Sequence, residues 1–168
     1  MTSPRIRPAP LGCLVLILAV IGGCSLPYIL HNRALSHVRA EYARIIHPAS
    51  SLALDSFSDL GIAAGGNGNH CDYLVGEIRE SDDSPAHIKA HYSTFSFPPL
   101  DAQSGQWAPR GPISVTVEFP GSPDDTGVLR WDIPDALTRA SAKQRKKTLY
   151  VVYLLDGGYD PNGDWRCH

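Results

Sequence analysis

The sequence predicts an α+β protein: an N-terminal apolar helix, then an amphipathic helix packed on a mostly antiparallel sheet of four or five strands, with one disulfide. Three observations predict it. Leu11–Leu30 carries no charge, apolar residues recur at spacings of three and four between Arg33 and His47, and later segments alternate apolar and polar residues. We therefore expect a membrane or signal segment over residues 1–30 and a single domain over residues 31–168.

The apolar run Leu11–Leu30 predicts a membrane helix. Its twenty uncharged residues, at about 1.5 Å of rise each, match the hydrocarbon core of about 30 Å. Arg5 and Arg7 precede the run without any acidic residue, as is typical of a cytoplasmic flank. The first interpretation is an uncleaved, single-pass anchor in the cell membrane, with the domain on the periplasmic or extracellular side.

Two other interpretations of residues 1–30 stay open. The segment Ile21-Gly22-Gly23-Cys24 resembles the lipobox of a bacterial lipoprotein signal, which makes Cys24 a lipidation candidate. The residues that follow Cys24 are apolar, whereas a lipoprotein usually continues with a polar tether. The third interpretation is an ordinary signal peptide, cleaved near the same small residues.

Cys71 and Cys167 are the two cysteines outside the apolar head, so they form one possible pair. In an oxidising compartment we expect a disulfide between them. Closing a loop of this length stabilises a fold by roughly 4 kcal/mol in the chain-entropy picture. A catalytic thiol or a metal ligand is the alternative. Adjacent strand residues point to opposite faces, so the pairs His70–Cys71 and Cys167–His168 can hardly place all four side chains on one metal, and a Cys2His2 site stays open only for reduced cysteines.

The first helix of the domain is predicted over Arg33–His47. Its apolar positions lie on one side and its charged positions on the other. Asn32 is a suitable N-cap and Pro48 ends the helix at the preceding residue. Pro27 and Asn32 suggest a break from the apolar helix before it, although a single bent helix is also compatible with the pattern.

The rest of the domain is predicted to be mainly strands. Leu52–Leu60 suggests a short helical turn that ends at Gly61, followed by a flexible loop over Ala63–Asn69. Strands are expected at Cys71–Glu80 with a bulge at Gly76, His87–Phe97, Ile113–Phe119, Val128–Ile133 and Thr148–Leu155, and a second helix between Asp135 and Lys146. Because Thr148–Leu155 is almost wholly apolar, we expect it in the centre of the sheet.

His87 and His91 are weak metal candidates. Their spacing of four residues places both on one face of an element, and zinc sites use such pairs. The pattern HIKAH lacks the glutamate of a zinc-protease motif, and no third ligand lies nearby. Surface histidines are the favoured interpretation.

Asp160, Asn162 and Asp164 are the other weak metal candidates. Alternating oxygen ligands begin a calcium-binding loop, but here a glycine comes at the fourth position and no glutamate closes the loop. Pro161 and Gly163 make a tight turn the favoured interpretation. The sequence therefore assigns no catalytic residue, no metal and no cofactor.

The charge balance argues against nucleic-acid binding. The formal net charge is −2 and no basic stripe is present. The favoured function is a membrane-anchored extracytoplasmic domain that binds a protein partner of the envelope, without enzymatic activity. Two alternatives stay open: a lipoprotein-type inhibitor or an assembly or secretion subunit, and a small metal-dependent hydrolase that uses His87 or His91 beside a carboxylate.

Overall fold

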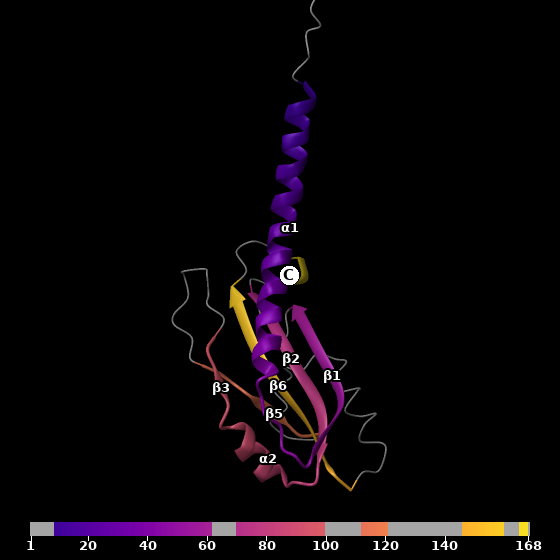
Figure 1. Cartoon of the computed structure of the whole chain (residues 1–168), viewed down its shortest axis with the longest axis vertical. Coiled ribbons are helices and arrows are strands. Elements are labelled where there is room, and N and C mark those ends of the chain that lie inside the picture. The colour runs from indigo at the N-terminus through magenta and orange to yellow at the C-terminus, as the bar shows by residue number, and fades with distance from the viewer. Residues whose placement is uncertain (1–8, 62–69, 100–111, 121–145, 160–164, 168) are drawn as a thin grey trace, which may run out of the picture.

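The protein has an α+β fold in which a long helix crosses one face of an antiparallel sheet (Figure 1). The computed structural model describes residues 9–61, 70–99, 112–120, 146–159 and 165–167. A helix packed on a four-stranded antiparallel sheet, together with one disulfide, confirms the α+β outline of the predicted fold.

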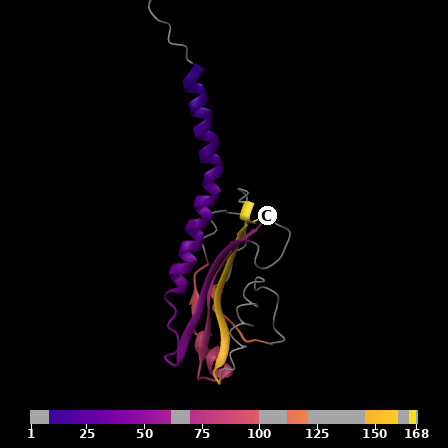
Figure 2. The same cartoon turned by 90° about the vertical axis from the view of Figure 1, so that its right-hand side faces the viewer.

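Helix α1 runs without interruption from Ala9 to Tyr42, so the predicted break between two helices is wrong. Pro27 lies inside it and removes one backbone hydrogen bond without ending the helix. The first part of α1 extends well beyond the sheet, and the last part packs on it (Figures 1 and 2). The helix ends at Tyr42 rather than at His47, because the chain turns there and buries Ile45 in the core.

The main sheet has four antiparallel strands in the order β1-β2-β6-β5. They are β1 (Ser51–Gly61), β2 (His70–Ser81), β6 (Thr148–Tyr159) and β5 (Thr116–Glu118). β6 lies between β2 and β5, as its apolar sequence predicted. Its residues 150–154 are at most 3% exposed, which confirms that both faces of this strand are covered.

Strand β1 replaces the predicted helical turn. The pairing of β1 with β2 shifts by one residue between Ala53 and Asp55, so the strand contains a bulge. The bulge interrupts the alternation of faces. It spreads the apolar side chains of this strand over spacings that resemble a helix: Leu52, Leu54, Phe57 and Leu60.

Gly76 of β2 forms no bulge, contrary to the prediction. It pairs in register with Phe57 on one side and Tyr153 on the other. A Cβ atom at this position would lie 2.6 Å from the Val152 carbonyl oxygen and 2.6 Å from the Phe57 ring. Glycine is needed here because the neighbouring strands and rings come too close for a side chain.

Residues 85–92 form helix α2 (Pro85–Tyr92), so the predicted strand over His87–Phe97 is wrong for most of its length. Ser84 caps the helix, since its hydroxyl accepts a hydrogen bond from the His87 amide at 3.3 Å. Pro85 occupies the first turn, where its missing N–H costs nothing. Ile88 and Tyr92, four residues apart, are fully buried.

The predicted strand over Ile113–Phe119 is confirmed in part. It divides into β4 (Ile113–Ser114), which pairs with β3 (Ser96–Phe97), and β5, which pairs with β6. A short 3-10 helix, η1 (Trp165–Cys167), follows β6. The predictions for Ala63–Asn69, Val128–Ile133 and the helix from Asp135 lie outside the described residues.

Buried apolar clusters lie on both faces of the sheet. The larger one joins α1, α2 and η1 to the face that α1 covers, with Val38, Ile88 and Val152 at its centre. The smaller one lies on the opposite face and contains Leu74, Ile78, Val151 and Tyr153. The alternation of β2 and β6 therefore supplies two separate cores from one pair of strands.

Candidate functional site

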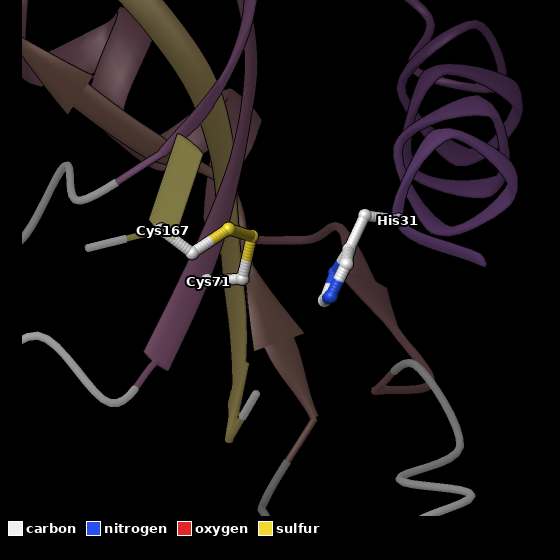
Figure 3. A group of neighbouring side chains, drawn as sticks. All are labelled: His31, Cys71 and Cys167. Atoms are coloured by element: carbon white, nitrogen blue, oxygen red, sulfur yellow. A yellow bond between two sulfur atoms is a disulfide. The ribbon is translucent and has the colours of Figure 1, made fainter. Parts of the chain in front are cut away.

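The first candidate site is the junction cluster, which we define as Tyr28, His31, Cys71, Tyr73, Arg166 and Cys167. It lies where α1 extends past the sheet, beside η1 (Figure 1), and Figure 3 shows three of its members, His31, Cys71 and Cys167. Cys71 at the start of β2 is joined by a disulfide to Cys167 of η1, with a Cα–Cα distance of 4.9 Å. Both cysteines are fully buried, and the bond confirms the predicted pairing.

His31 extends from α1 toward this disulfide, which joins β2 and η1 (Figure 3). The side chain is buried, and its Nδ1 atom lies 2.6 Å from the Tyr73 hydroxyl. The histidine nitrogen and the two sulfur atoms all lie within 4.8 Å of one another. Within the ranges that the structure covers, this is the one group of three side chains with metal-ligand atoms in mutual reach.

Arg166 fixes η1 to the helix. Its guanidinium lies 4.1 Å from the centre of the Tyr28 ring, and its Nη1 atom donates to the side-chain oxygen of Asn32 at 3.0 Å. Since Cys167 is bonded to β2, the short η1 connects helix and sheet. The direction in which α1 leaves the domain is thus set by covalent, polar and cation–π contacts together.

The second candidate site lies at the C-terminal end of α1. We call it the tyrosine–histidine cluster and define it as Tyr42, His47, Glu77, Arg79, Tyr92 and Tyr150. Arg79 forms an ion pair with Glu77. The Nδ1 atom of His47 lies 2.8 Å from the Tyr92 hydroxyl, which lies 3.2 Å from the Tyr150 hydroxyl. The Nε2 atom of His47 lies 3.7 Å from the Glu77 carboxylate.

Burial governs the protonation states of this second cluster. It lowers the pKa of His47, and the nearby Arg79 guanidinium lowers it further. Burial also raises the pKa of the Tyr42 and Tyr92 phenols. For Arg79 the hydrogen bond and charge of Glu77 outweigh burial and raise the pKa. At neutral pH the cluster therefore holds an ion pair, the neutral imidazole of His47 and the protonated phenols of Tyr42 and Tyr92. Together these groups connect the turn after α1 to the sheet.

An open groove of about 410 Å³ lies between α1 and β1. Its lining is mixed: Arg39, Tyr42, Ser56, Phe57, Ser58, Val75, Gly76 and Glu77. The Nε atom of Arg39 donates to the Ser58 hydroxyl across it at 2.8 Å. The groove is polar on its β1 side, because that strand contributes mainly serines.

The predicted weak metal candidates His87 and His91 lie on α2. His87 is exposed and its Nδ1 atom lies 3.2 Å from the Asp83 carboxylate. His91 contacts the backbone carbonyl oxygen of Ile46 through Nε2 at 2.7 Å. The hydrogen bond from Ser50 lowers the pKa of Asp83, so this carboxylate is ionised and serves the loop before α2. In the described part of the chain neither histidine belongs to a three-ligand group.

The other predicted candidates are the residues of the calcium-like loop, the lipidation candidate and the histidine before Cys71. Asp160, Asn162 and Asp164 lie outside the described residues, as do the side chains of Cys24 and His70. The sequence reasoning missed His31, because only the fold brings it to two cysteines far along the chain. No local pattern around His31 signals this role, since it stands alone at the border of the apolar run.

The fold and the junction cluster define an α+β protein with a disulfide-closed helix–sheet junction. Comparison with protein-family models, with curated proteins and with solved structures finds no match to this chain. Over the part of the chain that the structure describes, no helix is both long enough and apolar enough to cross a membrane.

Proposed function

We propose that the protein is a membrane-tethered interaction domain, with Leu11–Leu30 as the tether and the sheet as the presented domain. The observation that carries the proposal is the extension of α1 beyond the sheet (Figure 2). Large apolar side chains on this extension are about half exposed or more: Leu14, Val15, Leu16, Val20, Leu26 and Ile29. Such a surface is costly in water and stable in lipid or against a partner.

The disulfide supports an extracytoplasmic location for the domain. Bonds of this kind form and persist in the periplasm and outside the cell, whereas cytosolic reductants keep thiols reduced. Cys71 and Cys167 are both buried, so reductants reach their bond slowly. Arg5 and Arg7, on the other side of the apolar run, agree with a cytoplasmic N-terminus.

The junction cluster supports a role in presentation rather than in simple attachment. Arg166 binds α1 at Tyr28 and Asn32, and the disulfide binds the same short helix to β2. A flexible tether would let the domain rotate freely. A fixed junction presents the same face of the sheet to a membrane-bound protein partner, which lowers the entropy lost on binding.

Intact-mass measurement of the protein extracted from membranes tests the tether. We expect the full-length mass in the pellet after alkaline extraction. A mass that begins at Cys24 with added acyl chains would support the lipoprotein alternative instead. An unmodified, trimmed mass in the soluble fraction would overturn the tether. Cross-linking in intact cells then tests for an envelope protein partner.

A further inference from the structure

We propose that His31, Cys71 and Cys167 bind one zinc ion when the two cysteines are reduced. The three side chains come from α1, β2 and η1, and their ligand atoms already lie within 4.8 Å of one another. All three are buried, so water does not compete strongly for their positions. The proposal does not depend on the membrane tether.

The donor set suits zinc. Thiolate sulfur and imidazole nitrogen are its usual protein ligands, at about 2.3 Å and about 2.0 Å. In a tetrahedral site two sulfurs bound to one metal are about 3.8 Å apart, given those bond lengths. Cys71 and Cys167 have a Cα–Cα distance of 4.9 Å, so rotation of the side chains separates the sulfurs without moving the strand and η1 apart.

The disulfide and the metal exclude each other. A small dithiol reductant attacks one sulfur, forms a mixed disulfide, and then closes on itself, which leaves Cys71 and Cys167 as two thiols and the reductant as its own disulfide. Zinc then displaces one proton from each thiol and binds both thiolates. The same two residues thus close the junction either through a covalent bond or through a metal.

Tyr73 orients His31, the third ligand. Its hydroxyl lies 2.6 Å from the Nδ1 atom of His31, and the two rings are stacked with centres 6.0 Å apart. Contacts of this kind fix the orientation of a metal-binding histidine in known sites. Three protein ligands leave the fourth position of a tetrahedral zinc ion open to one further ligand.

Cobalt(II) titration of the full-length protein tests the site, because tetrahedral cobalt with thiolate ligands absorbs in the visible and near-ultraviolet. After reduction by a dithiol and removal of the reductant, we expect one equivalent of cobalt with thiolate charge-transfer bands, displaced by zinc. The oxidised protein should show neither the visible absorption of tetrahedral cobalt nor the thiolate charge-transfer bands. A reduced protein that binds no cobalt would overturn the proposal.

Two matched histidine variants assign the nitrogen ligand. His31→Gln should weaken zinc binding by at least tenfold and change the cobalt spectrum, whereas His37→Gln, on an exposed position of the same helix, should change neither. Folding of His31→Gln is checked in the oxidised state by its disulfide and its melting temperature. Equal zinc affinity in the two variants would exclude His31 as a ligand.

Discussion

The two halves of α1 belong to one helix but meet different surroundings. In the first half Leu16 and Val20 are 67% and 57% exposed, whereas in the second half Leu35 and Val38 are 8% and 2% exposed. The second half buries its apolar side chains against β2 and β6. The first half has nearly continuous apolar sequence and extends past the sheet (Figure 1).

This difference shows how one continuous helix carries two patterns. A stripe of apolar residues at spacings of three and four is enough where one side faces a protein core and the other faces water. A helix that is apolar all round needs apolar surroundings on every side. The pattern changes near His31, and the junction cluster lies at the same level.

The largest expected effect comes from charging the first half. Leu16→Lys combined with Val20→Lys should release the protein from membranes, since each lysine near the middle of a bilayer costs about 3 kcal/mol. Cell fractionation and vesicle flotation measure the effect. Ala40→Lys, at an exposed position of the second half, is the control and should stay bound. If the double variant floats with the vesicles as well as the control does, the proposed tether is wrong.

Removing the disulfide should have the next largest effect. It should lower the stability of the domain on which the second half of α1 packs. We expect Cys71→Ser to lower the free energy of unfolding by about 4 kcal/mol, because the bond closes a loop with a sequence separation of 96 residues. Denaturant unfolding measures it. Cys167→Ser and the double variant should lose the same amount, since all three remove one bond. A loss in the double variant equal to the sum of two independent losses would contradict this reading.

A pair of identical substitutions compares the halves directly. Val38→Ala should destabilise the domain by about 2 kcal/mol, because it leaves a cavity beside the sheet. Val20→Ala should leave the free energy of unfolding unchanged, because the side chain contacts no core. Thermal and denaturant unfolding of both variants in detergent measure the difference. Equal losses would show that the first half also packs on protein.

A smaller effect is expected from acid at the tyrosine–histidine cluster. Burial, aided by Arg79, lowers the pKa of His47 below its ordinary value of 6.5. As the pH falls, the unfolded chain therefore binds a proton at this histidine before the folded protein does. The free energy of unfolding keeps the full contribution of His47 above about pH 6.5 and loses it progressively below that pH. His47→Gln should flatten the decrease in unfolding free energy between pH 6.5 and the lower pKa. An unchanged slope in the variant would exclude His47 as its source.

Sequence patterns predicted the features that depend on one physical cause, such as burial of both faces of a strand or a single available cysteine partner. The apolar run of β6 indicated a central strand because both of its faces are covered, and the two isolated cysteines left one possible disulfide. Strand β1 was missed because the bulge at Ala53 and Asp55 disrupts the alternation on which a strand prediction depends. Helix α2 was missed although the pair Ser84 and Pro85 is a typical helix start.

The candidate sites depended on contacts between distant segments. His31 meets Cys71 and Cys167 only because α1 crosses the sheet beside the start of β2. Likewise, His47 reaches Glu77 because the chain turns after Tyr42. The prediction had placed His47 inside the helix. Spacing along the chain singled out His87 and His91 instead, and these serve local contacts in α2.

The most direct test of the account is the depth of α1 in a bilayer. An environment-sensitive fluorophore is attached at Val20→Cys or at Ala40→Cys, in the full chain with Cys13 and Cys24 replaced by alanine and the disulfide intact. In vesicles, the label at position 20 should be quenched by lipid-borne quenchers and protected from iodide, and the label at position 40 should show the reverse. Equal quenching by iodide at both positions would contradict the claim that the two halves of α1 occupy different solvents.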